Sequence, residues 1–279
     1  MAGQFRSLIG AAIVALTSAG CGDHNSSPTA PTSGDSAGSG GGSGYTSPAG
    51  SVTASPGDRS DFRVFTETGD INQRLVEFRS ALGDPSNGGT PGPLLAGRRE
   101  IKWDGAPADM PGDFFNTTVK AGAIFSTDGT GFRNSAVDFA EINPAYADDF
   151  NAFSAPKTFM PLGSAELTVS FRVPGTQELA ATRGFGVVFS DVERVGAASI
   201  KLFDADGRSL GQYHAPVRSD AAGFSFVGVV FDSPIVAEVR ISSGQRALGA
   251  DVQDLSDGGN LDLAVMDDYL YGEPQGIGE

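Results

Sequence analysis

Apolar and polar residues alternate with a period of two along the second half of the chain, which is typical of half-buried β-strands. The pattern is clearest at 166–173, where every second residue is apolar. Six further segments have the same strand-like character: 185–192, 199–203, 210–214, 224–230, 235–241 and 261–271. Turn residues such as Pro174-Gly175 and Asp206-Gly207 separate them. We therefore predict seven short strands.

A different spacing, close to one helical turn, marks the segment before these strands. Ile71, Leu75, Phe78 and Leu82 fall on one face of a helix. Asp70 is suited to cap its start, and glycine follows its end. Residues 84–97 are rich in proline and glycine and predict a loop, and residues 101–161 are interpreted as long surface loops.

These elements predict a mainly β fold, namely an antiparallel two-sheet, jelly-roll-like sandwich with one short helix and long loops. The strands lack intervening helices, which argues against a parallel α/β sheet. We assign residues 61–275 to this single domain and residues 276–279 to a tail.

The first twenty residues have the order of an export signal. Arg6 supplies a positive charge, residues 8–15 form a short apolar run, and small residues then lead to Cys21. The small-small-Cys ending resembles the bacterial lipoprotein cleavage box, which implies a signal peptide over 1–20 and a lipid on Cys21. The alternative is an ordinary cleaved signal that happens to contain a cysteine. By the same resemblance, Gly22 after the cysteine implies the outer membrane or cell surface as the destination.

Residues 21–60 consist almost entirely of small and polar residues, including the run GSGGGSG at 38–44. Without an apolar periodicity they cannot form a packed core, so we interpret them as a flexible tether. A removable pro-segment is the alternative.

Charge and residue usage exclude several classes of function. The chain has 34 acidic and 19 basic residues, a net charge of −15, which disfavours nucleic acid and attracts divalent cations. Only His214 lies in the predicted domain, so a histidine-based zinc site is excluded. Cys21 is the sole cysteine, and no nucleophile elbow or phosphate-binding loop is present.

Several motifs together suggest a known group. They are REIKWDG at 99–105, DFFN at 113–116, FRVPGT at 171–176, RGFGVVFSDVE at 183–193, FDADGRSLG at 203–211 and VMDDYLYGEP at 265–274. The combination resembles uncharacterised exported bacterial proteins, some of which carry a C-terminal sorting signal of the PEP type. The resemblance implies a sandwich of the kind found in lectins and carbohydrate-binding modules.

Acidic residues at predicted strand ends are the candidate metal ligands: Asp191, Glu193, Asp267 and Asp268. Strand parity places Asp191 and Asp267 toward the core and Asp268 on the opposite face, and buried carboxylates need a partner or a metal. Carboxylate oxygens suit Ca²⁺, which is the cofactor we predict. The alternative is that these acids cap loops or pair with nearby arginines.

Other acids have simpler interpretations. Asp204 and Asp206 superficially resemble the start of a calcium loop, but a hairpin turn explains them better. Asp251, Asp254 and Asp257 form a looser group before the last predicted strand.

Aromatic residues provide the candidate ligand-binding positions. Trp103, Tyr269 and Tyr271 are candidates for stacking on sugar rings, although a tryptophan is more often part of the core or of loop packing.

The leading hypothesis is a non-enzymatic, surface-anchored module that binds a glycan or cell-envelope polymer, with structural calcium. The alternatives are a structural or matrix protein without a small ligand, and a hydrolase or lyase that uses paired carboxylates. We expect the module to bind membrane through its lipid and not to bind nucleic acid.

Overall fold

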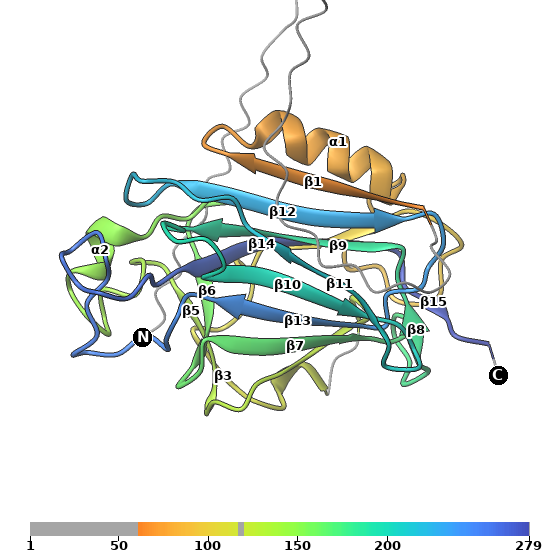
Figure 1. Ribbon diagram of the computed structural model, residues 1–279. Coiled ribbons are helices and arrows are strands. Elements are labelled where there is room, and N and C mark those ends of the chain that lie inside the picture. Colours follow the sequence, from red (N-terminus) through yellow and green to blue (C-terminus); the bar gives the residue numbers. More distant parts are fainter. Residues whose placement is uncertain (1–60, 117–119, 279) are drawn as a thin grey trace, which may run out of the picture. The chain divides into compact units, whose positions relative to one another are not determined.

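The computed structural model describes residues 61–116 and 120–278. The predictions for the signal peptide, Cys21 and the tether lie outside these residues. Within them, the expected antiparallel two-sheet sandwich is confirmed (Figure 1). No helix in the described part of the chain is long and apolar enough to cross a membrane.

The larger sheet has the strand order β1-β12-β9-β14-β6-β5-β3, and β2 also pairs with β14. All of its pairings are antiparallel. Its strands are β1 (Phe62–Thr68), β2 (Arg98–Ile101), β3 (Asp109–Pro111), β5 (Gly131–Ser135), β6 (Thr158–Leu162), β9 (Gly184–Ser190), β12 (Phe224–Phe231) and β14 (Val265–Gly272).

The smaller sheet has the order β11-β10-β13-β7-β4. Its strands are β4 (Ala123–Ser126), β7 (Glu166–Phe171), β10 (Ala198–Phe203), β11 (Ser209–His214) and β13 (Glu238–Ser243). A separate two-stranded ladder joins β8 (Ala180–Ala181) to β15 (Gln275–Gly276). Apolar side chains such as Phe125, Val169, Phe185 and Tyr269 form the main core between the sheets.

The predicted helix is confirmed as α1 (Asn72–Leu82), which lies over β1 and β12 on the outer face of the larger sheet (Figure 1). Ile71, Leu75, Phe78 and Leu82 are buried there in a second apolar cluster. Asp70 precedes the N-cap position by one residue, and its carboxylate accepts a hydrogen bond from the Asn72 amide at 3.2 Å.

Two glycines paired across β9 and β12 allow this close approach of the helix. A Cβ atom at Gly186 or Gly228 would lie 2.7 or 2.6 Å from the Phe78 ring. Because the helix covers the sheet, β9 is buried along its whole length and shows no polar alternation.

The interpretation of residues 101–161 as surface loops is wrong. This segment forms β3 to β6, a short helix α2 (Tyr146–Asp149) and a 3₁₀ turn, η1 (Phe114–Asn116). The strands have three to five residues each, and four of the five residues of β6 are buried. Strands this short offer too few residues for a clear period-two signal, and β5 and β6 are also buried on both faces.

The seven predicted strands are present, but two of them begin later than expected. The strand predicted from 235 begins at Glu238, and the strand predicted from 261 begins at Val265. The Leu263 amide donates to the Asp254 carboxylate at 2.7 Å, so residues just before β14 bond to a loop side chain.

Candidate functional site

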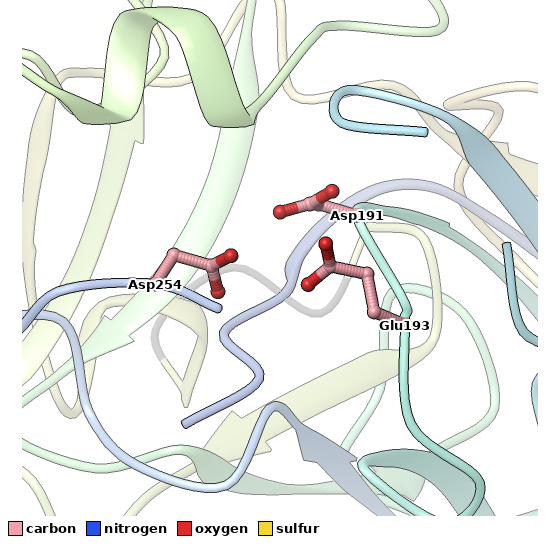
Figure 2. A group of neighbouring side chains, drawn as sticks. All are labelled: Asp191, Glu193 and Asp254. Carbon is pink, nitrogen blue, oxygen red and sulfur yellow. The ribbon is translucent and has the colours of Figure 1, made fainter. Parts of the chain in front are cut away.

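Three acidic side chains converge at one end of the sandwich (Figure 2). Asp191 and Glu193 directly follow β9, and Asp254 lies in residues 244–264, the segment that joins β13 to β14. Each contributes one carboxylate oxygen to a group in which all the oxygens lie within 4.8 Å of one another.

The hydrogen bonding of these three carboxylates is uneven. Asp191 is completely buried, and neither of its carboxylate oxygens has a hydrogen-bond partner. Glu193 is half-buried, and its Oε2 is also without a partner. Asp254 is fixed by its own segment, because it accepts bonds from the Ser256 amide and hydroxyl at 2.7 and 2.8 Å.

Two further buried acids border this group. Asp149 of α2 shares the Ser256 hydroxyl with Asp254, at 2.9 Å from one Asp149 oxygen, and its other oxygen has no partner. Asp262 accepts bonds from the backbone amides of Glu193 and Arg194, and its Oδ1 has no partner. We refer to Asp149, Asp191, Glu193, Asp254 and Asp262 as the acidic cluster.

No positive side chain within the described ranges forms an ion pair with the acidic cluster. Burial and then repulsion from neighbouring carboxylates raise the pKa of Asp191 to about 9. The same causes raise the pKa of Glu193 to about 7. Burial raises the pKa of Asp149 to about 6, against the opposing effect of its hydrogen bond from Ser256. The cluster can therefore hold protons, or its oxygens can hold a cation.

The prediction that Asp191 and Asp267 share a site is wrong. Asp267 and Asp268 of β14 instead contact the loop before β6, and neither belongs to the group of carboxylates around Asp191. The Asp267 carboxylate accepts bonds from the amides of Phe153 and Ser154 at 2.6 and 3.0 Å. Asp254, which does join Asp191 and Glu193, lies about sixty residues further along, and no local pattern links it to them.

The expected opposite orientation of Asp267 and Asp268 is also wrong. Both side chains are buried, and the Ser154 hydroxyl lies within hydrogen-bonding distance of both carboxylates. The register of β14 against β9 shifts between Met266 and Tyr269, which interrupts the alternation of faces.

The predicted aromatic ligand-binding residues are buried in the core. Trp103 is 3% exposed, and its ring stacks on Phe159 with a centroid separation of 3.7 Å. Tyr269 and Tyr271 are both 0% exposed. The Tyr271 hydroxyl donates to the Ala121 carbonyl at 2.8 Å. These rings cannot stack on a surface ligand, so the core interpretation of Trp103 is correct and the sugar-binding assignment fails.

The hairpin interpretation of Asp204 and Asp206 is confirmed. These residues connect β10 to β11, and the Asp204 carboxylate accepts bonds from the amides of Asp206 and Arg208 at 2.9 and 2.8 Å.

The outer face of the smaller sheet carries polar side chains and a hollow. In β7 and β13, buried Leu167, Val169, Val239 and Ile241 alternate with polar residues. A hollow of about 400 Å³ lies on this face. It is lined by Ser126, Thr127, Asp128, Glu166, Leu167, Thr168, Glu238 and Arg240.

One row of this face runs across all five strands. The strand register places Gln212 opposite Lys201, Lys201 opposite Arg240, Arg240 opposite Thr168, and Thr168 opposite Ser126. We call these five residues the polar row. Lys201 and Arg240 both cover the Phe203 ring, at 5.2 and 4.6 Å from its centroid.

No protein-family model matches the chain, and no curated protein matches it. Among solved structures, one likeness is to a carbohydrate-binding module in complex with β-1,4-galactotriose. It has 12% identity and a TM-score of 0.27, and covers 64% of this chain and 99% of the module. Another is to the enzymatically active domain of tailspike protein 4 of bacteriophage CBA120. It has 14% identity and a TM-score of 0.23, and covers 56% of this chain and 20% of that one.

Proposed function

We propose that this protein is an exported, non-enzymatic binding module for a glycan or cell-envelope polymer, held at the bacterial surface by a lipid on Cys21. The observation that carries the binding proposal is the polar row beside the hollow on the outer face of the smaller sheet. The lipid anchor rests on the export-signal pattern that ends at Cys21.

The chemistry of this face suits a ligand with many hydroxyl groups. Thr168 and Ser126 can donate and accept hydrogen bonds, Arg240 can only donate, and the nearby Glu166 can only accept. Sugar hydroxyls need both kinds of partner. Positive and negative side chains are mixed here, which favours a neutral or weakly charged polymer over a polyanion.

Replacing Arg240 with alanine tests the site. Arg240 is exposed, with 61% of its side chain accessible, so its removal should leave the fold intact. We expect the dissociation constant for a bound glycan to rise about tenfold or more, because a charge-assisted hydrogen bond contributes about 1.5–3 kcal/mol. A glycan array followed by affinity electrophoresis with the full chain measures this change.

Arg208→Ala is the matched control, because Arg208 is an exposed arginine of the β10–β11 hairpin outside the polar row. It should bind like the unmodified chain. Silence across the array would favour a matrix protein without a small ligand. Release of reducing sugars from a bound polymer would favour the hydrolase or lyase alternative.

The anchor is tested separately by Cys21→Ser. Without its thiol the mature chain cannot be acylated, and single or paired acyl chains supply the membrane affinity. We expect the protein to move from the membrane fraction to the soluble fraction, as measured by fractionation and immunoblotting. Continued membrane association of the Cys21→Ser protein would contradict the lipid anchor without touching the glycan proposal.

A further inference from the structure

We propose that Asp191, Glu193 and Asp254 bind a calcium ion, which fastens residues 244–264 to the end of the sandwich (Figure 2). This inference is independent of any glycan, because the acidic cluster and the polar row lie on different elements.

The strongest reason is the state of Asp191. Its side chain is 0% exposed, both of its carboxylate oxygens lack a donor, and it points into the group formed with Glu193 and Asp254. A buried carboxylate without partners is costly, so such groups are normally hydrogen-bonded, paired with a charge or bound to a metal. The backbone of Asp191 also has a left-handed φ of 67°, an uncommon conformation for a residue other than glycine.

The side chain of Arg194, a candidate counter-charge, is directed elsewhere. The Arg194 guanidinium donates to the Gln245 side chain at 3.1 Å and to the Asn260 carbonyl at 2.7 Å. It fixes the same segment as Asp254 but forms no ion pair with the cluster. The charge of these carboxylates therefore has to be balanced by protons or by a cation.

The geometry and the donor atoms favour calcium. Oxygens that bind one Ca²⁺ at about 2.3–2.6 Å lie no more than about 5 Å apart, and the three oxygens here lie within 4.8 Å of one another. Asp149 and Asp262 offer further unpartnered oxygens at the border, which suits a coordination number of six to eight. All of the donors are hard carboxylate oxygens, whereas structural zinc sites use cysteine and histidine.

The ion would add a link between the end of β9 and residues 244–264, whose facing carboxylates repel each other when they are ionised. Residues 244–264 form no helix or strand, and their only β-pairing is an isolated bridge between Asp254 and Leu261. The Tyr146 hydroxyl holds the segment through the Gly249 and Val252 carbonyls at 3.0 and 2.8 Å. A divalent cation shared by the three carboxylates replaces any repulsion between them with attraction to the ion.

Calorimetric titration of CaCl₂ into the chelator-treated full chain tests the proposal. We expect binding, and a rise in melting temperature of about 5–10 °C at a calcium concentration a hundredfold above the dissociation constant. Asp191→Asn should lose calcium binding, and Glu193→Gln and Asp254→Asn should weaken it at least tenfold. Asparagine tolerates the left-handed backbone and carries no charge in the buried site, so in chelator Asp191→Asn should melt no lower than the unmodified chain.

Asp206→Asn is the matched control, because Asp206 is exposed in the β10–β11 hairpin. It should bind calcium normally. Hydrogen exchange gives a second readout, since calcium should slow exchange in residues 244–264 in the unmodified chain but not in Asp191→Asn. The proposal would be overturned if calcium produced neither heat nor a melting shift in the unmodified chain. It would also be overturned if Asp191→Asn bound calcium normally.

Discussion

Replacing Glu273 with glutamine should lower the free energy of unfolding by about 3–5 kcal/mol, because it leaves the buried Arg99 guanidinium without its counter-charge. Arg99 is 0% exposed, and it binds both oxygens of the Glu273 carboxylate, Nε to Oε2 at 2.7 Å and Nη2 to Oε1 at 2.8 Å. The loss should appear in urea unfolding followed by circular dichroism.

The size of this effect follows from how much else depends on the pair. Arg99 Nη1 donates to the carbonyls of Gly88 and Thr90 at 3.0 and 2.8 Å, and Asn87 donates to Glu273 at 2.7 Å. The pair therefore fixes the glycine- and proline-rich loop 84–97 onto β2 and the end of β14. If either residue of the pair is replaced, buried polar groups of that loop lose their hydrogen bonds.

Glu77→Gln provides the control for this prediction. Glu77 also pairs with an arginine, Arg74, but both side chains are more than a third accessible. Exposed pairs of this kind contribute about 0–1 kcal/mol. If Glu273→Gln cost no more than Glu77→Gln, the buried pair would not have the structural role we assign to it.

Regular periodicity explains which parts of the fold were predictable. The helical spacing from Ile71 to Leu82 and the alternation in β7 and β13 each report one buried and one open face. Both features are found in the structure because each element has one buried and one solvent-facing side. The helix α1 packs on an apolar sheet face, and the smaller sheet turns a polar face toward solvent.

Long-range contacts explain what was not predictable. Asp254 meets Asp191 only because residues 244–264 fold back onto the end of β9, and a segment without periodicity gives no sign of that path. The register shift in β14 likewise places Asp267 and Asp268 together, where strict alternation separates them. Tyr269 and Tyr271 could be recognised as buried only once β2 and β9 were known to flank β14.

The Arg99–Glu273 pair is another long-range contact that the sequence alone does not reveal. Arg99 begins the segment REIKWDG, Glu273 lies in the segment VMDDYLYGEP, and the structure places Arg99 directly opposite Tyr271 in the β2–β14 ladder. The two motifs therefore form one buried contact, although neither shows its partner when considered alone.

A second large effect is expected in the pH dependence of folding stability, and it arises from the buried pair of Asp267 and Asp268. Burial, together with repulsion from Asp268, raises the pKa of Asp267 to about 8. The charged groups that face the pair are Arg79, 4.0 Å from Asp268, and Lys102 and Glu100 at longer range. None of them supplies enough positive charge to ionise both acids.

The sign of the effect follows from proton linkage. Between pH 4 and pH 8 the folded protein holds a proton on Asp267 that the unfolded chain releases, because the folded pKa is higher than the unfolded one. The folded state is therefore favoured at low pH, and this contribution is lost as the pH rises toward 8. At about 1.4 kcal/mol per pH unit, the loss amounts to roughly 5 kcal/mol across the window.

Asp267→Asn should remove this dependence. The asparagine carbonyl can accept the bonds from Phe153 and Ser154, and its amide can donate to Asp268 without carrying a charge. We expect the variant to be the more stable protein at pH 8 and to lose that advantage toward pH 4. Urea unfolding at intervals across this range measures the difference between the two proteins.

Taking that difference cancels the contribution of the acidic cluster, which titrates in the same direction in both proteins. Asp104→Asn is the control, because Asp104 is exposed. The stability of the Asp104→Asn protein should equal that of the unmodified chain at every pH. If the curves of Asp267→Asn and the unmodified chain ran parallel from pH 4 to pH 8, the proton would not reside on this pair. The pH dependence of the fold would then have to come from other carboxylates.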